Sequence, residues 1–400
     1  MKHTIKHLTA LLLSALLLTS CGVPTEPQNT TAALGTTAAT ASGEAATDAS
    51  LSDETEAPAP TYLDPASLPM IYTQEDVCGE PAIKSYKKFA QCAAEEFIVP
   101  GLNQSMVPQG MDYWADRNWI LISGYCTDET LNGGKGSVIL AVDAESGEMM
   151  GEYYLKNADG TYHDSHVGGV AVTKKNVFIS NASTLYRIPL SAFDEAKQCG
   201  DVTIVEEIAV PVSASFANFS GGILWVGDFQ YSTSYPTDEF RHMKNRQGSM
   251  YYAWTVGYAL DETTENELKA SAMVKDSFAT PDYVLSITER IQGMTYLPEA
   301  GKVVLSQSYG RTNDSMLYLY DDPLGDAPHA TTTLNGVSVP VWFLDSKMNQ
   351  KNMSALPMSE GIANVNGEVY VLFESGANKY RLGGGKLPTD MVYSVDVTKY

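Results

Sequence analysis

The fold of this chain is decided by a stretch that reads QGMDYWADRNWILIS over residues 109–123. Its first part contains a glycine, and its second part, after a polar turn, is rich in isoleucine and leucine, which favours two antiparallel strands joined by a short turn. The same order recurs at residues 168, 215, 292 and 360, where the chain reads GGVAV, SFANF, QGMTY and EGIAN. The copy at 215 is the weakest. Each copy predicts the two inner strands of one repeating unit.

Two further strands are expected in each unit. The segments that we assign to them are 138–142 and 151–155, 184–189 and 202–210, 250–260 and 270–274, 316–320 and 337–344, and 379–382 and 392–397. Four antiparallel strands per unit, repeated in a closed ring, are typical of a β-propeller. We therefore predict an all-β, five-bladed propeller over residues 67–400, in which the run 96–100 adds the missing outer strand of the last blade. One helix is expected, around residues 83–95.

The first residues have the order of an export signal. Lys2 and Lys6 precede an apolar run from Leu8 to Leu18, which is too short to span a bilayer as a helix. The next residues, Leu18-Thr19-Ser20-Cys21, resemble the lipobox of bacterial lipoproteins. This resemblance implies that residues 1–20 are removed, that Cys21 carries lipid, and that the chain is anchored to the cell membrane on its extracytoplasmic face. An ordinary signal peptide that contains a cysteine is the alternative.

Residues 21–66 form a linker dominated by Thr, Ala, Ser, Glu and Pro. Because such a segment buries too little apolar surface to offset its chain entropy, we predict a disordered tether. A flexible chain of this length has a mean reach of roughly 35–40 Å. The tether would therefore lift the folded domain away from the lipid headgroups.

The charge of the chain bears on its partners. There are 26 basic and 48 acidic residues, a formal net charge of −22. This charge repels phosphate backbones, so we predict that the protein does not bind nucleic acid. Four cysteines follow Cys21, and two disulfides or four free thiols fit their number: Cys78, Cys92, Cys126 and Cys199.

A site is expected at one mouth of the central channel. In a propeller, the start of each innermost strand and the end of each second strand lie on the same face, because the two strands are antiparallel. Polar residues occupy these places in the repeat, and a pocket lined by them is the default binding site. Alternatively, these side chains hold the blades together. The candidates are Gln109, His166, Asn218, Asp228, Gln292, Arg311, Glu360 and Glu374.

The candidate residues speak against several kinds of enzyme. Glycosidases need two carboxyl groups about 5–10 Å apart, whereas the equivalent inner-strand positions hold Glu360 and two glutamines, although Asp112, Asp228 or Glu374 could supply a second carboxylate. The sequence has no G-x-S-x-G motif for a serine nucleophile. A hard cation such as calcium at Glu360, with Asn218 and Asp228, stays as an alternative.

The strand starts Q-G-M, G-G-V and E-G-I resemble those of bacterial extracytoplasmic propellers, including strictosidine-synthase-like and gluconolactonase-like proteins. The resemblance extends over residues 109–400 and implies the fold. Those relatives keep acidic and amide metal ligands in the channel, and only Glu360 occupies such a position here. No activity is carried over.

Three functions are compatible with these observations. The leading prediction is a monomeric, membrane-anchored propeller without a cofactor that binds a small polar ligand, a glycan or a partner protein at the channel mouth. The alternative is a hydrolase or lactonase that uses a divalent cation in the channel. A purely structural or assembly role is the third, and the sequence favours a protein that is not an enzyme.

Overall fold

The structure is a computed structural model that describes residues 62–79 and 82–400. The predicted signal peptide, the lipidated Cys21 and nearly all of the predicted linker lie outside the described residues. Contacts with the folded domain begin before the predicted boundary at residue 67. The ring of Tyr62 packs against Trp119, with 4.7 Å between ring centroids, and the backbone N–H of Leu63 donates to Gln198.

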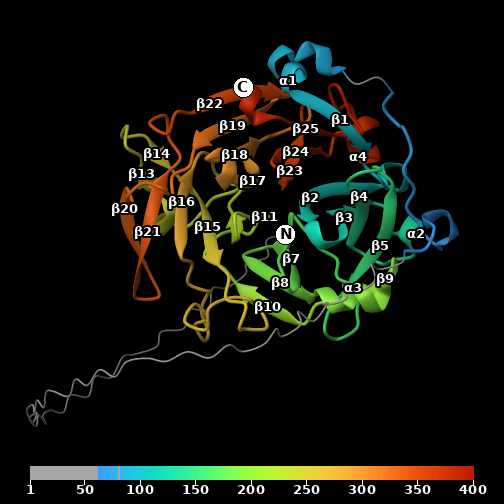
Figure 1. Cartoon of the computed structure of the whole chain (residues 1–400), viewed down its shortest axis with the longest axis horizontal. Coiled ribbons are helices and arrows are strands. Elements are labelled where there is room, and N and C mark those ends of the chain that lie inside the picture. Colours follow the sequence, from blue (N-terminus) through green and yellow to red (C-terminus); the bar gives the residue numbers. More distant parts are fainter. Residues whose placement is uncertain (1–61, 80–81) are drawn as a thin grey trace, which may run out of the picture. The chain divides into compact units, whose positions relative to one another are not determined.

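Five antiparallel sheets surround a central axis, which confirms the five-bladed β-propeller (Figure 1). Blade 1 contains β2 (Met106–Trp114), β3 (Trp119–Cys126), β4 (Val138–Asp143) and β5 (Met149–Lys156). Blade 2 contains β6 (Gly169–Val172), β7 (Asn176–Asn181), β8 (Thr184–Pro189) and β10 (Glu206–Ala209). Blade 3 contains β11 (Phe216–Ser220), β12 (Ile223–Gly227), β15 (Ala253–Ala259) and β16 (Tyr283–Ile287).

The remaining two blades complete the ring. Blade 4 contains β17 (Ile291–Leu297), β18 (Lys302–Gln307), β19 (Ser315–Asp321) and β22 (Lys351–Ala355). Blade 5 contains β23 (Ser359–Val365), β24 (Glu368–Phe373), β25 (Met391–Val395) and β1 (Ala93–Ile98). Strand β1 pairs antiparallel with β25, from Ala93 opposite Val395 to Ile98 opposite Met391. The predicted closure of the ring by the segment that precedes the first blade is therefore confirmed.

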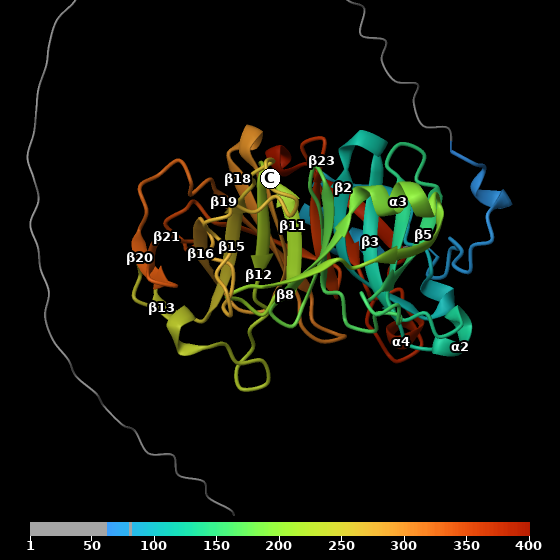
Figure 2. The same ribbon diagram turned by 90° about the horizontal axis from the view of Figure 1, so that it is seen from below.

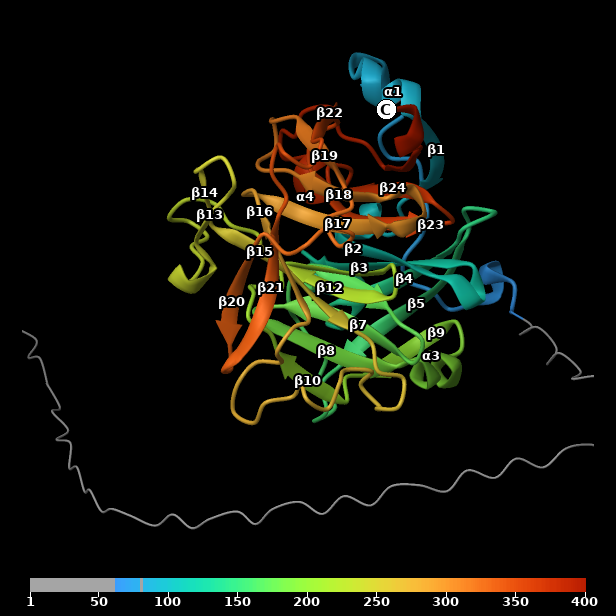
Figure 3. The same cartoon turned by 60° about the vertical axis from the view of Figure 1, so that its left-hand side comes forward.

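Several outer strands differ from the prediction. Residues 270–274 are not a strand, and β16 is the fourth strand of blade 3 instead. Strand β21 (Val337–Phe343) was expected in blade 4, but it pairs in parallel with β16 of blade 3 and carries β20 (Ala330–Leu334) with it. Strand β9 (Cys199–Thr203) pairs in parallel with β5 of blade 1. Figure 3 shows β20 and β21 on the outside of β16, beside the short hairpin β13 (Met243–Lys244) and β14 (Met250–Tyr251).

Helices are few and short. They are α1 (Lys87–Cys92), α2 (Glu129–Asn132), α3 (Leu190–Ala196) and α4 (Asn378–Arg381). Single 3-10 turns span η1 (Pro65–Ser67), η2 (Ala82–Ser85), η3 (Leu102–Gln104), η4 (Ala115–Arg117), η5 (Glu239–Arg241), η6 (Pro298–Ala300) and η7 (Val397–Lys399). Helix α1 lies in the segment predicted as helical, whereas α4 occupies residues that were predicted as a strand. Figure 2 shows α2 and α4 at the same end of the blades.

The core is divided into five apolar clusters, one between each pair of adjacent blades. Strand β3 shows how the sequence produces this arrangement. Ile120 and Ile122 pack toward blade 5, while Leu121 between them packs toward blade 2. Because successive side chains of a strand point to opposite faces, a run of apolar residues fills both interfaces of a blade at once.

Glycines in the repeated pattern let the inner strands approach one another. A Cβ atom on Gly110 would lie 2.5 Å from the backbone nitrogen of Val170 in blade 2. One on Gly169 would lie 2.0 Å from the backbone nitrogen of Ala217 in blade 3. Both distances are shorter than any van der Waals contact, so the recurrent glycine is required by the narrow axis of the ring.

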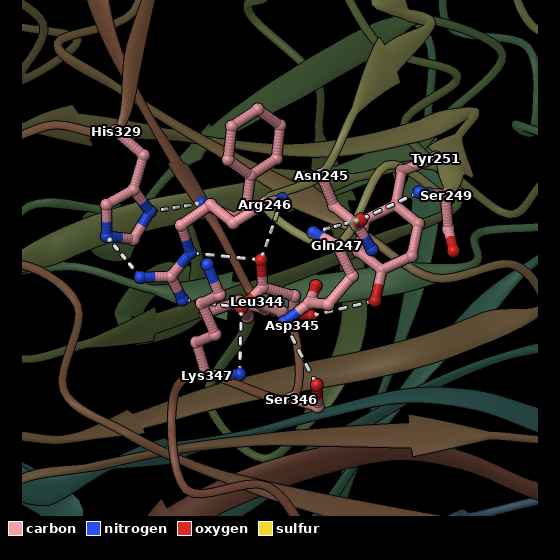
Figure 4. Close-up of polar contacts among 11 residues, drawn as sticks. Asn245, Arg246, Gln247, Ser249, Tyr251, His329, Leu344, Asp345, Ser346 and Lys347 are labelled. Carbon is pink, nitrogen blue, oxygen red and sulfur yellow. Dashed lines mark hydrogen bonds and ion pairs between the residues drawn. The ribbon is translucent and has the colours of Figure 1, made fainter.

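The β13–β14 hairpin, an insertion in blade 3, is held by an ion pair (Figure 4). Arg246 donates from Nε to Oδ2 of Asp345 at 3.0 Å and from a terminal nitrogen to Oδ1 at 2.5 Å. Burial tends to raise the pKa of Asp345, but hydrogen bonds from Arg246 and from the backbone hold that pKa below its usual value. His329 lies 3.1 Å from the other end of the guanidinium group. The insertion is therefore fixed to the loop that follows β21.

The described part of the chain contains four cysteines, and all four are free thiols: Cys78, Cys92, Cys126 and Cys199. Of the helices in residues 62–79 and 82–400, none has the length and apolar composition needed to cross a membrane.

Candidate functional site

Three inner strands carry a β-bulge at the same end of the channel. The register of β2 shifts between Pro108 and Gly110, that of β17 between Ile291 and Gly293, and that of β23 between Ser359 and Ile362. The residues at these shifts are Gln109, Gln292 and Glu360. A bulge turns a side chain out of the regular alternation of the strand. The three side chains consequently line one cavity.

A pair of carboxyl groups forms the floor of this cavity. Glu360 comes from the bulge in β23, and Glu374 directly follows the neighbouring strand β24. Glu360 and Glu374 hydrogen-bond each other. The amide of Gln292 donates to Oε1 of Glu360 at 2.9 Å, and that of Gln109 donates to Oε2 of Glu374 at 3.0 Å. Each carboxyl group is thus held by one glutamine and by the other carboxyl group.

The two carboxyl groups share a proton at neutral pH. Burial raises the pKa of Glu360 well above its usual value, and the adjacent charge of Glu374 raises it further. Burial also raises the pKa of Glu374, to about 7, against the hydrogen bonds from Tyr380, Glu360 and Gln109. Two like charges in contact within a buried site cannot both form without a large cost. Glu360 therefore carries the proton and donates it to Glu374.

Above the floor, the cavity has a volume of about 420 Å³ and an aromatic wall. Phe229, Tyr235 and Tyr309 line it, and all three come from loops at the ends of strands. The ring centroids of Phe229 and Tyr235 are 5.1 Å apart, and Tyr309 packs on Tyr231 with 4.2 Å between centroids. Tyr235 is 52 % exposed, so this wall reaches the open surface.

The rim carries positive charge. The ammonium group of Lys379, on α4, donates to the hydroxyl of Tyr125 at 2.7 Å. Arg311 lies over the ring of Tyr380, at 5.1 Å from its centroid, and donates to the carbonyl of Gly383 at 2.9 Å. His166, which keeps exposed surface at the rim, stacks on Tyr125. Partial desolvation by its surroundings, together with the charge of Lys379, lowers its pKa, so this imidazole is neutral.

Six of the eight candidate residues line the cavity: Gln109, His166, Gln292, Arg311, Glu360 and Glu374. Asn218 and Asp228 do not. Asp228 follows β12 at the expected end of the channel, but its carboxylate is fully buried and faces the blade. It accepts from the backbone N–H groups of Ser213 and Trp254 and pairs with Arg241 at 2.6 Å. Asp228 was thus misplaced, because the blade itself satisfies both of its oxygens.

Asn218 is buried outside the cavity and reaches from blade 3 to blades 1 and 5. Its amide donates to Oδ1 of Asp112 at 3.0 Å and to the carbonyl of Ile362 at 3.3 Å. Oδ2 of Asp112 accepts the backbone N–H groups of Val172 at 2.7 Å and Phe219 at 3.0 Å. These contacts join blades 1, 2, 3 and 5. Neither residue is accessible from the cavity, so their role is structural.

This contact between blades leads to a testable prediction. We expect Asp112→Leu to lower the free energy of unfolding by about 2–4 kcal/mol, because two buried backbone N–H groups lose their acceptor. Asp112→Asn should lose clearly less, since its amide oxygen can still accept both N–H groups, while its NH₂ group meets the NH₂ group of Asn218 and costs only the contact between these two side chains. Urea unfolding of the two variants measures the difference. Equal losses for both would contradict the assignment.

Some lining residues were not predicted from the sequence. Phe229, Tyr235, Lys379 and Tyr380 lie in segments that have no counterpart in the other repeats. Residues 379–382 were expected to form a strand, but α4 carries Lys379 and Tyr380 over the cavity instead. The sequence does offer one signal for Tyr235: the tyrosine-containing run 231–235 follows shortly after the end of β12.

The described residues contain no group of three or more His, Cys, Asp or Glu side chains placed to hold a metal ion. The carboxyl oxygens of the floor instead receive amide N–H groups and a shared proton. A calcium ion at Glu360 stays an untested prediction.

The fold and the site define a five-bladed β-propeller with a polar pocket at one mouth of its channel. No protein-family model matches the chain, and no curated protein sequence matches it. Among solved structures, a glutaminyl cyclase of Myxococcus xanthus is similar over 76 % of this chain and 95 % of its own, with 11 % identity and a TM-score of 0.37.

Two other solved structures are similar. A nidogen/laminin complex matches 67 % of this chain and 73 % of its own, with 8 % identity and a TM-score of 0.31. The Dos1 propeller matches 68 % of this chain and 55 % of its own, with 10 % identity and a TM-score of 0.27. These likenesses concern the arrangement of strands and indicate no activity.

Proposed function

We propose that this protein is a membrane-anchored, extracytoplasmic binding protein whose propeller holds a small polar ligand in the pocket at the channel mouth. The observation that carries the proposal is the built floor of the pocket. Glu360, Glu374, Gln109 and Gln292 converge from three blades and are mutually oriented by hydrogen bonds. Such convergent polar groups under an aromatic wall are the usual composition of a small-molecule site, and about 420 Å³ lies within the usual range of volume.

Binding is tested by thermal unfolding of the protein in the presence of panels of small polar compounds: sugars, polyols, nucleosides, amino acids and dipeptides. A ligand present at 100 times its dissociation constant adds about 2.7 kcal/mol to the free energy of unfolding, which should raise the melting temperature by several degrees. Gln292→Met should abolish the response, whereas Gln247→Met, on the distant β13–β14 hairpin, should preserve it. If no compound shifts the wild-type protein, the proposal fails.

The same measurement addresses the divalent-cation alternative. Chelation with EDTA should leave the melting temperature unchanged if the pocket binds its ligand without a metal ion. A fall on chelation that calcium reverses, and that Glu360→Gln removes, would favour the hydrolase or lactonase instead.

The anchor is tested separately. We expect the full-length chain, expressed in a bacterial host, to sediment with membranes and to be released by detergent. Cys21→Ala should move most of the protein to the soluble extracytoplasmic fraction, because one lipid-bearing thiol is the proposed attachment. Cys78→Ala is the matched control and should leave the distribution unchanged. Membrane retention of Cys21→Ala would overturn the lipid anchor but not the proposed pocket.

A further inference from the structure

We propose that the ligand is a small zwitterion whose primary ammonium group docks between Glu360 and Glu374 on the floor of the cavity. This inference rests on the proposed function and specifies the chemistry of the ligand. It follows from three features of the cavity: the acceptors of its floor, the cations of its rim and the aromatic rings of its wall.

The floor presents mainly hydrogen-bond acceptors. Gln109 and Gln292 both turn their NH₂ groups toward the carboxyl groups. Among the described residues, neither Oε1 atom of these two glutamines accepts a hydrogen bond, although Gln109 is only 3 % exposed and lines the cavity. These two oxygens are open to the cavity and can accept a hydrogen bond from a donor group of a bound ligand. An ammonium group supplies three donors and no acceptor, and therefore matches this floor.

The charges around the pocket indicate which charged group the ligand bears besides its ammonium group. The floor holds one negative charge, shared by Glu360 and Glu374, whereas Lys379 and Arg311 place two positive charges at the rim. The neighbouring His166 is neutral and adds none. A simple cation would be repelled on entry by the two rim residues. If the ligand also bears a carboxylate, Lys379 and Arg311 attract that group and offset the repulsion, because Arg and Lys are the usual partners of carboxylates.

The wall and the volume limit the size of the ligand. Phe229, Tyr235 and Tyr309 offer ring faces on which an apolar side chain or an ammonium group can pack. A cavity of about 420 Å³ accommodates a free amino acid or a dipeptide but not a folded partner. The class of ligand is therefore an α-amino acid or a short peptide with a free N-terminus.

Binding of an ammonium group between the two carboxyl groups should release protons, and this release can be measured. Before binding, burial keeps a proton on Glu360, and Glu374, whose pKa is raised to about 7, is ionised only as the pH rises past that value. When the ammonium group enters with its own three protons, the O–H bond of Glu360 breaks and that proton passes to solvent. Both carboxylates then accept from the ammonium group. Binding should consequently release the proton of Glu360 and, near pH 7, a further fraction of a proton from Glu374 that shrinks as the pH rises; no other bond changes.

The experiment compares free amines with their N-acetylated forms. The wild-type protein is titrated with the common L-amino acids and with dipeptides, each against its N-acetyl derivative, by thermal shift and calorimetry. The best free amine is then titrated in phosphate and in HEPES buffer, neither of which carries a primary amine, because the difference in heat reports the protons released. We expect N-acetylation to abolish binding. Glu360→Gln should weaken it at least about tenfold, and Glu368→Gln, exposed in blade 5, should leave it unchanged.

The outcomes separate the two proposals. Equal binding of N-acetylated forms, or binding without proton release, would overturn the zwitterion. If sugars or nucleosides bind in a Gln292-dependent way while no amine does, the zwitterion fails and the binding pocket stands. If nothing binds, both fail. Should Glu360→Gln not fold, as judged by its melting curve, Gln292→Met serves as the second variant and should weaken amine binding.

Discussion

A chain that begins at residue 99 should not fold, whereas a chain that begins at residue 62 should unfold in one cooperative transition. The difference comprises helix α1, strand β1 and residues 62–79, whose Tyr72 belongs to the core. Residues Ala93–Ile98 form the outer strand of blade 5 and pair along β25, so their removal opens the sheet that joins the two ends of the described chain.

The expected loss is large because two core clusters are affected. Phe97 is buried between blades 5 and 1, and Phe89 is fully buried between blades 4 and 5. Truncating one buried phenylalanine costs about 3–5 kcal/mol, and a domain has only about 5–15 kcal/mol in total. Far-ultraviolet circular dichroism during heating measures the result. A similar melting temperature for both chains would show that the closure contributes little to stability.

The inner half of each blade could be predicted from the sequence, because its signals are local. A glycine where strands approach, a polar turn and an apolar run specify β2–β3 and β23–β24 without reference to the rest of the chain. The outer strands could not be predicted in the same way. The alternating apolar residues of β21 indicate a strand, but only the exposed edge of β16 and the clusters beside it decide that β21 belongs to blade 3.

The same distinction holds for the site: residues at repeated positions could be predicted from the sequence, and residues in insertions could not. Gln109, Gln292 and Glu360 occupy equivalent places in the repeat, so aligning the repeats brings them to one point. Asp228 follows the second strand of its blade, as Glu374 does in blade 5, yet its carboxylate pairs with Arg241 from an insertion and is held within the blade. The aromatic wall and α4 also come from insertions. Their positions depend on how the insertions pack on the blades, and aligning the repeats gives no information about this packing. Residues 379–381 belong to α4 instead of the predicted strand. A strand there could not pair with β24, because β24 already lies between β23 and β25.

Stability should fall as the pH rises from about 5 to about 8, and the carboxyl pair should account for much of the fall. The folded-state pKa of Glu374 is raised to about 7 from the usual 4.5, and that of Glu360 is raised well above it. Between pH 4.5 and about pH 7, the usual and the folded-state pKa of Glu374, the folded protein binds more protons than the unfolded chain. Its free energy of unfolding therefore decreases with pH, and the contribution is lost as the pH passes the folded-state pKa.

The size of the effect follows from about 1.4 kcal/mol for each unit of pKa. For Glu374 this gives about 3 kcal/mol, and Glu360 adds to it. Asp112, with a pKa raised by burial to about 7, contributes in the same direction. Three histidines, His163, His166 and His329, act in the opposite direction, because their lowered pKa makes the folded state bind fewer protons below about pH 6.5.

Comparing variants removes the histidine contribution, since it is the same in each protein. The double variant Glu360→Gln/Glu374→Gln keeps the shape of the pair and cannot ionise. We expect it to be more stable than the wild type at pH 8 by more than about 3 kcal/mol, and to differ little near pH 4. Glu368→Gln, which is exposed, should track the wild type throughout. Urea unfolding between pH 4 and 8 gives the difference directly, and parallel curves for the wild type and the double variant would show that Glu360 and Glu374 do not share a proton.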